Sequence, residues 1–168
     1  YKIELLMKQA KISPEDRKVV SAALVKANTG GLPAAAMELD DGRIITGKTS
    51  DLLGASAALI LNAVKTLAGI DDSVHLISPK VIEPVQKLKT TYLGSKNPRL
   101  HTDEVLIALS VSAADNEQAK LALDQLPKLR NTEVHSSVML SSVDLKTFKR
   151  LGVRLSSEPR YESKKLYH

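Results

Sequence analysis

Residues 34–69 constrain the fold of this chain more than any other segment. A short apolar run at 34–39 is followed by Asp40-Asp41-Gly42 and then by a second run at 43–46 that is rich in β-branched residues. An Asp-Gly pair between two such runs is a strong local signal for a β-hairpin. The pattern next predicts a buried helix over 51–68, because its middle is apolar on nearly every side. We therefore expect a strand, turn, strand and helix at the centre of an α/β domain.

Strands and helices are predicted to alternate along the rest of the chain. The patterns favour strands at 74–78, 105–111, 133–140 and 153–156, and helices at 79–93, 116–129 and 144–151. Alternation of this kind is typical of a sheet with helices on both faces. Since the hairpin adds antiparallel pairing, we predict a three-layer α/β/α domain with a mixed sheet over residues 32–168. Residues 1–31 read as a helical hairpin or linker that ends at Gly30-Gly31.

Composition narrows the chemistry that is open to the chain. Its 168 residues include no Cys, no Trp and one Phe, so disulfides, thiolate metal ligands and a Cys nucleophile are excluded. With so few aromatic side chains and a scattered net charge of +5, we do not expect nucleic-acid binding. No apolar run reaches the roughly 18 residues of a membrane span, and the N-terminus has no signal-peptide pattern. We therefore predict a cytoplasmic protein without a membrane association.

A nucleotide P-loop pattern is present from Gly42 to Thr49. A P-loop must curl so that its N–H groups face a phosphate, whereas Ile44 and Ile45 inside the match favour an extended strand. The hairpin is therefore the preferred interpretation, and a nucleotide loop is the alternative. The residues from Lys48 to Ser50 still precede a helix, where free N–H groups and a nearby cation can bind an anion. Ordinary helix capping by Thr49 or Ser50 is the other interpretation.

A polar loop at residues 94–104 supplies further candidates for the same site. It contains Arg99 and His101, and loops on a rigid scaffold often carry function. His135 lies in a predicted strand beside two serines. The spacings of the histidines match no common zinc pattern, and we predict no metal or other cofactor. The predicted ligand-binding residues are Lys48, Thr49, Ser50, Arg99, His101 and His135, and the expected ligand is a small phosphorylated anion.

The hairpin and the Ala-rich helix after it resemble the opening of the cytidine deaminase fold. That resemblance implies a His or Cys with a Glu at the first helix start and two Cys at the next. Here residues 55–57 are Ala-Ser-Ala and residues 79–82 are Pro-Lys-Val-Ile. We therefore expect a deaminase-like core that lacks zinc ligands and deaminase activity. Both helix starts are expected to open toward the same end of the sheet, where ligands usually bind.

Strings along nearly the whole chain resemble the C-terminal part of an uncharacterised bacterial family. The strings are TGKTSDLLGAS at 46–56, HLISP at 75–79, LGSKNPRLHTDE at 93–104, VHSS at 134–137 and KKLYH at 164–168. The family is catalogued as domain of unknown function eighteen forty-six, and its members are longer, with further N-terminal domains. The resemblance implies a C-terminal domain of a longer protein and brings no reaction with it. We predict a domain that binds a small anion, and the alternative is a homo-oligomerisation module of a larger enzyme.

Overall fold

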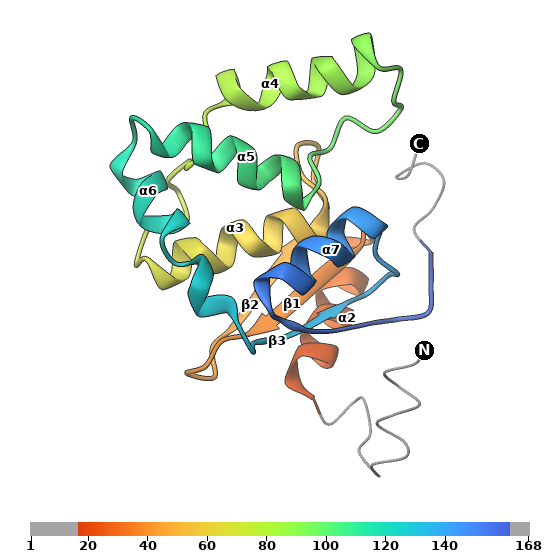
Figure 1. The fold of residues 1–168 in the computed structure, drawn as a ribbon. Helices are drawn as coiled ribbons and strands as arrows, with labels where there is room; N and C mark the ends of the chain where they lie inside the picture. The colour runs from red at the N-terminus through yellow and green to blue at the C-terminus, as the bar shows by residue number, and fades with distance from the viewer. Residues whose placement is uncertain (1–16, 162–168) are drawn as a thin grey trace.

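The computed structural model describes residues 17–161, which form an α/β fold around one mixed sheet (Figure 1). The four strands follow the order β2-β1-β3-β4. β1 (Ala34–Glu38) pairs antiparallel with both β2 (Ile44–Lys48) and β3 (Glu133–Ser136), and β3 pairs parallel with β4 (Arg154–Ser157). The predicted mixed sheet is therefore confirmed.

Helices cover both faces of the sheet, which fits the predicted three-layer arrangement. α2 (Lys18–Gly30) packs on one face, where Val19 and Ala23 cluster with Ala36 of β1. α3 (Ala55–Leu67) packs on the other face, where the alternate β1 residues Ala35 and Met37 join the main core. Figure 1 shows α5 and α4 beyond α3, farther from the sheet. The remaining helices are α4 (Pro79–Lys87), α5 (Thr102–Ala113), α6 (Glu117–Leu123) and α7 (Ser142–Leu151), with a π-helical turn at Leu88–Tyr92 and a 3-10 turn at Leu126–Leu129.

The predicted hairpin is confirmed, and the P-loop interpretation is wrong. The turn closes with hydrogen bonds from Leu39 N to Arg43 O and from Gly42 N to Leu39 O, each 2.9 Å long. Gly42 has a φ of 89°, which glycine adopts without a steric penalty. The residues after it pair with β1 as an extended strand, so their N–H groups do not curl around a phosphate.

The contact between β2 and α3 depends on Gly47. A Cβ atom at this position would lie 2.3 Å from the backbone N of Leu59 and 2.7 Å from the carbonyl O of Ala55. The helix therefore packs directly against the backbone of the strand. This close approach also positions the first turn of α3 next to the residues that follow β2.

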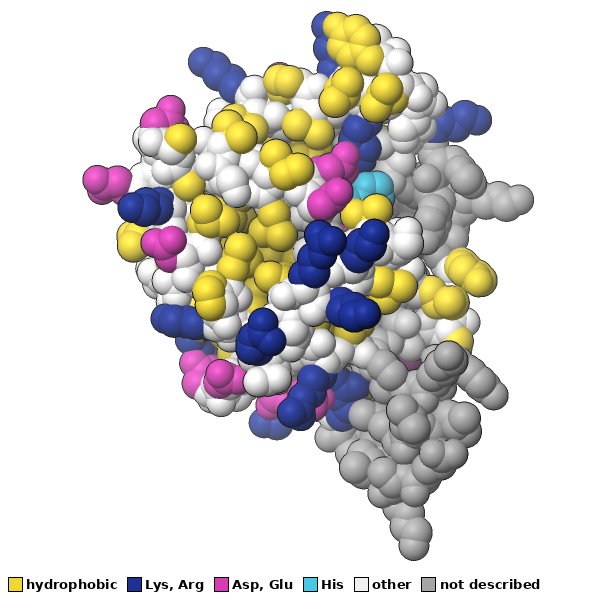
Figure 2. Space-filling view, in the orientation of Figure 1, with side chains coloured by type: hydrophobic (Ala, Val, Ile, Leu, Met, Phe, Trp, Pro, Cys, Tyr) yellow, Lys and Arg dark blue, Asp and Glu magenta, His cyan; other side chains and the backbone are white. Residues whose placement is uncertain are grey.

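The strand predicted at 105–111 is wrong, because this segment lies in α5. The continuous apolar run obscured the helical pattern of this segment. Its buried residues follow the spacing of one helix face: Val105, Ala108, Leu109 and Ser112. Ile107 and Val111 on the outer face are 64% and 58% exposed, and Figure 2 shows hydrophobic side chains on this side of the molecule. A capping box of His101 and Glu104 begins the helix. The spacing of the buried residues and the capping box are those of a helix, whereas hydrophobicity alone does not distinguish a helix from a strand in this segment.

The strand predicted at 74–78 is also wrong, because these residues form a loop between α3 and α4. The buried Lys65 of α3 donates from Nζ to the carbonyl oxygens of Asp72 at 2.8 Å and Val74 at 2.7 Å. A side chain therefore satisfies backbone groups that strand pairing would otherwise occupy. Leu76 and Ile77 from the same loop are buried in the core.

The other predicted elements occur with shifted ends. The helix predicted at 51–68 begins later, at Ala55, and the strand predicted at 133–140 stops at Ser136. The helix predicted at 116–129 divides into α6 and the 3-10 turn that contains Pro127. α2 ends at Gly30 with Gly31 as its C-cap, as predicted, whereas residues 1–16 of the predicted helical hairpin lie outside the described residues. Within residues 17–161, no helix has the length and apolar character needed to cross a membrane.

Candidate functional site

The N-termini of three helices meet at one pocket. Gly54, His101 and Ser141 are the N-cap residues of α3, α5 and α7, and all three line it. Helix N-termini carry free N–H groups and a partial positive charge, so their convergence favours an anion. The cavity volume is about 50 Å³. Since one water needs roughly 10–15 Å³ by this measure, the pocket has room for a group the size of a tetrahedral oxyanion.

The start of α3 is the open position in this pocket. Its N-cap residue Gly54 has no side chain, and no side chain among residues 17–161 caps this helix. By contrast, Glu104 accepts a hydrogen bond from the N-cap N–H of α5 at 2.8 Å. Ser141 Oγ accepts one from Asp144 N at 3.3 Å in α7. The first-turn N–H groups of α3 are therefore left for a ligand.

Thr49 places a buried hydroxyl group beside the open start of α3. The residue is 2% exposed, and its Oγ1 has no hydrogen-bond partner in the described part of the chain. Its backbone N donates to Pro33 O at 3.0 Å, which holds the residue after β2. Leaving a buried polar group unsatisfied costs about 1–3 kcal/mol. A hydroxyl kept at that cost in a pocket is well placed for a ligand that supplies the missing partner.

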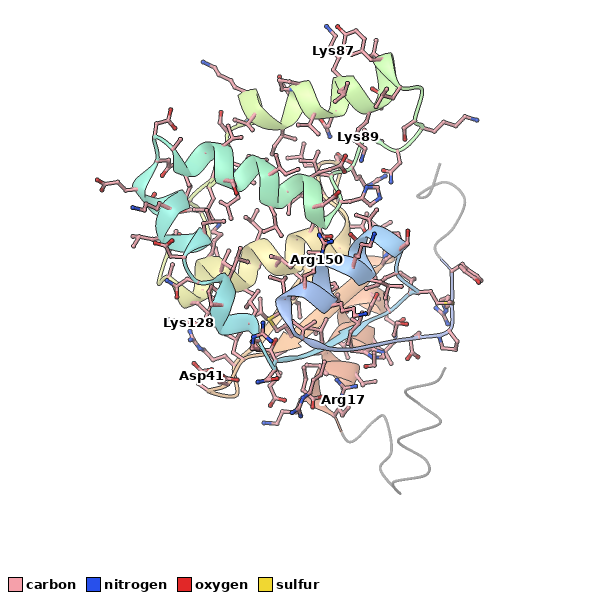
Figure 3. All side chains as sticks on the ribbon, in the orientation of Figure 1. Arg17, Asp41, Lys87, Lys89, Lys128 and Arg150 are labelled. Atoms are coloured by element: carbon pink, nitrogen blue, oxygen red, sulfur yellow. The ribbon has the colours of Figure 1, made fainter. Side chains whose placement is uncertain are left out.

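A network of three charged or titratable side chains borders the pocket at the start of α5. Glu104 Oε1 accepts from Lys89 Nζ at 2.9 Å and lies 3.1 Å from His101 Nδ1, and Figure 3 shows Lys89 near this helix start. Burial opposes ionisation of Glu104, but its hydrogen bonds with His101 and Lys89 lower its pKa to about 2. The hydrogen bond to Glu104 raises the pKa of His101, against burial and the charge of Lys89. Glu104 therefore contacts Nδ1 of His101, and among residues 17–161 no hydrogen bond occupies Nε2.

This network predicts an acid-dependent loss of stability. A carboxyl group whose folded pKa is lowered stabilises the fold above its unfolded value near 4.5, and this contribution disappears as the pH falls toward 2. We expect Glu104→Gln to lower the free energy of unfolding at pH 7 by on the order of 2 kcal/mol, allowing for partial exposure. Near pH 2 the variant and the parent should differ little. Urea unfolding across this pH range measures both differences.

The neighbouring acid Asp103 provides the control for that experiment. Its side chain is exposed, and within residues 17–161 its Oδ1 accepts a hydrogen bond only from the adjacent Glu104 N. Asp103→Asn should therefore leave the pH dependence close to that of the parent. A Glu104→Gln variant whose stability falls between pH 5 and pH 2 as steeply as that of the parent would contradict this assignment.

Thr49, Arg99 and His101 are the predicted ligand-binding residues that line the pocket. Arg99 Nε donates to the carbonyl O of Ser50 at 2.6 Å, which ties the polar loop to the segment before α3. Ser50 itself does not line the pocket. Its Oγ accepts from Leu53 N at 3.1 Å and closes a local turn. The structure therefore joins two predicted segments that are far apart in the sequence.

Lys48 and His135 lie elsewhere. Lys48 is exposed at the end of β2, near Gly30 of α2. His135 pairs with Ala36 across the sheet, on the face that α2 covers. It is 2% exposed and lies 2.7 Å from Ser156 Oγ and 3.0 Å from Glu158 Oε2. Its neighbour Ser136 points to the opposite face and lines the pocket, as strand alternation requires.

Several pocket residues were not predicted from the sequence. They are Gly54, Ser56, Ser136, Ser141 and Asp144. Ser141 and Asp144 have the spacing of a helix-start motif, which is the one local signal that could have indicated them. The helix start at Ser78–Pro79, which was expected to open at this site, does not line the pocket. The starts of α5 and α7 occupy that place beside α3.

Comparison with known proteins gives a consistent family match. The family described as "Domain of unknown function DUF1846, C-terminal" matches residues 15–167. A UPF0371 protein of Corynebacterium glutamicum (strain R) is 58% identical over 166 residues, which are 99% of this chain and 34% of the relative. UPF0371 protein CE2832 of Corynebacterium efficiens is 59% identical, and UPF0371 protein SUB1165 of Streptococcus uberis is 49% identical, with the same coverage. The chain thus spans about a third of the length of these relatives.

Proposed function

This chain belongs to the family described as domain of unknown function DUF1846, C-terminal, and we propose that it binds a small phosphorylated ligand. The ligand's phosphoryl group would occupy the pocket at the start of α3. The observation that carries this proposal is the buried Thr49 hydroxyl, which has no partner among residues 17–161. It adjoins a helix N-terminus that no described side chain caps. The oxygens of a phosphoryl group would accept hydrogen bonds both from the Thr49 hydroxyl and from the free N–H groups at the start of α3.

A guanidinium group and an imidazole ring at the rim support the same ligand class. Arg99 Nε donates to the Ser50 carbonyl, and within the described part of the chain no hydrogen bond occupies its terminal nitrogens, which are also donors. His101 lines the pocket, and its hydrogen bond to Glu104 raises its pKa and so extends the pH range of its positive charge. Charged donors make shorter and stronger hydrogen bonds to phosphate than neutral donors do. We therefore expect Thr49 and the α3 N–H groups to accompany Arg99 and His101 around the phosphoryl group.

Thr49→Val tests the proposal through stability and binding together. The substitution keeps the shape and removes a buried hydroxyl that lacks a partner, so the ligand-free protein should gain about 1 kcal/mol in unfolding free energy. The same variant should bind inorganic phosphate about tenfold more weakly, since one hydrogen bond to a charged group is lost. Thermal unfolding with and without millimolar phosphate measures both effects.

Thr132→Val is the matched control. Thr132 is equally buried at 2% exposure, but its Oγ1 donates to Leu129 O at 2.6 Å. Removing that hydroxyl should destabilise the protein by about 1–3 kcal/mol and leave phosphate binding unchanged. The proposal fails if phosphate does not stabilise the parent protein, or if it stabilises Thr49→Val to the same extent.

We also propose a deaminase-like core in which this pocket has lost its metal chemistry. The β-hairpin, the buried α3 and the antiparallel pairing of β1 with β3 support the resemblance. The residues at the α3 start are Ala55, Ser56 and Ala57, which provide no zinc ligand. In residues 17–161, no three His, Cys, Asp or Glu side chains are grouped to hold a metal ion. The donor set therefore suits an oxyanion better than zinc.

The remaining predictions concern the longer protein. A homo-oligomer and a cytoplasmic location stay predictions, as does the lack of nucleic-acid binding. Light scattering on a full-length relative checks the first of them. A strictly monomeric relative would contradict an assembly role without affecting the proposed phosphate site.

A further inference from the structure

Asp144 is an acid in a pocket whose other features favour an anion. Its Oδ1 accepts from Thr102 N at 3.1 Å and from Thr102 Oγ1 at 2.7 Å, which links α7 to the start of α5. Within residues 17–161, no hydrogen bond occupies its Oδ2. The residue is partly buried and lines the same pocket as Thr49 and Gly54. Any anion bound at the α3 start must therefore coexist with a nearby carboxylate.

An ionised carboxylate only accepts hydrogen bonds, so it distinguishes between oxyanions of similar shape. Hydrogen phosphate and sulfate are both tetrahedral and doubly negative near neutral pH. Hydrogen phosphate retains an O–H group that can donate to a carboxylate oxygen, and sulfate has no such donor. Beside Asp144, sulfate would meet a like charge without a compensating hydrogen bond. Repulsion of this kind is an efficient source of specificity.

We infer that the pocket selects an oxyanion that carries its own proton, such as hydrogen phosphate or a singly protonated phosphate monoester. This inference rests on the proposed function and assigns its ligand class. The ligand's O–H donates to Asp144 Oδ2, and its other oxygens accept from Thr49 and the first-turn N–H groups of α3. The Arg99 guanidinium offsets negative charge at the rim, and His101 provides a further hydrogen-bond donor there. Asp144 is thus the specificity-determining residue of the site.

Calorimetric titration with inorganic phosphate and with sulfate tests the inference at pH 7, at low millimolar concentrations and constant ionic strength. The protein should bind phosphate at least about tenfold more tightly than sulfate, since a hydrogen bond to a charged group is worth that factor or more. Asp144→Asn keeps Oδ1 as the acceptor for Thr102 and replaces Oδ2 with a donor. In this variant sulfate binding should strengthen by at least about tenfold, and the preference should fall to within about threefold.

Two further variants separate this effect from general salt effects. Gly54→Asp places a carboxylate at the N-cap of α3, where it occupies the N–H groups and should abolish binding of both anions. Asp103→Asn removes an exposed acid that does not line the pocket and should keep the preference for phosphate.

The outcomes distinguish the inference from the proposed function. Equal affinity for phosphate and sulfate in the parent protein overturns the inference and leaves oxyanion binding intact. Binding of neither anion overturns the proposed function itself. A folded Asp144→Asn variant that still rejects sulfate also overturns the inference. If this variant does not fold, the ratio of the two affinities in the parent protein decides.

Discussion

Gly47→Ala is expected to destabilise the protein by at least about 3 kcal/mol. The added Cβ would lie 2.3 Å from the backbone N of Leu59 and 2.7 Å from the carbonyl O of Ala55. Both atoms belong to the backbone of α3, so the conflict cannot be relieved by rotating a side chain. The helix must move away from β2, which opens the core between them. Urea unfolding compares the free energies of unfolding of the two proteins.

Gly54→Ala is the control for this prediction. A Cβ at Gly54 would have Leu100 O as its nearest neighbour, at 3.8 Å, which is an ordinary contact. Its φ of −69° is also accessible to alanine, so a change within about 1 kcal/mol is expected. Similar unfolding midpoints for both variants would contradict the role given to Gly47. Any folded fraction of Gly47→Ala should also bind phosphate weakly, because the start of α3 would be displaced from Thr49.

Phe148→Ala should produce the second large effect, a loss of about 3–5 kcal/mol in unfolding free energy. Phe148 is the one Phe of the chain, and it is 1% exposed in the main core. It anchors α7, the helix whose first turn carries Ser141 and Asp144 into the pocket. Removing the ring leaves a cavity that the surrounding aliphatic side chains fill only in part. Denaturant unfolding monitored by circular dichroism measures the loss.

Two substitutions calibrate this result. Phe148→Leu retains most of the buried volume and should lose clearly less stability than the alanine variant. Lys149→Ala changes the exposed neighbour on the same helix and should stay within about 0.5 kcal/mol of the parent. A Phe148→Ala variant as stable as Lys149→Ala would show that α7 does not depend on this side chain. The site would then need another anchor for Asp144.

Predictions from the sequence succeeded where neighbours in the chain decide the structure. The hairpin depends on Gly42 and on the two short runs beside it, all within about fifteen residues. The end of α7 at Gly152 follows from a glycine with a φ of 79°. Prediction failed at α5, because an apolar run that continues on all sides does not reveal its period by hydrophobicity alone. It failed at residues 74–78, because Lys65 occupies the backbone carbonyl groups there.

The residues of the candidate site also fall into those that local patterns predicted and those that only the tertiary structure brought together. Thr49, Arg99 and His101 were predicted because a helix start and a polar loop are visible as local patterns. Asp144 was visible as part of a helix start, but its bond to Thr102 joins residues 42 positions apart. Nothing local indicated that the starts of α5 and α7 would meet beside α3. His135 shows the converse, since strand alternation turns it to the α2 face and Ser136 to the pocket.

The segment from 34 to 69 shows which features the sequence determines and which depend on the tertiary structure. By itself the sequence determined the hairpin, the helix after it and the family, because turn chemistry, hydrophobic spacing and matching strings are local properties. Only the tertiary structure decided that the Thr49 hydroxyl is buried without a partner among residues 17–161 and that Asp144 lines the same pocket. Burial and hydrogen-bond satisfaction depend on contacts between distant segments, and no single segment encodes them.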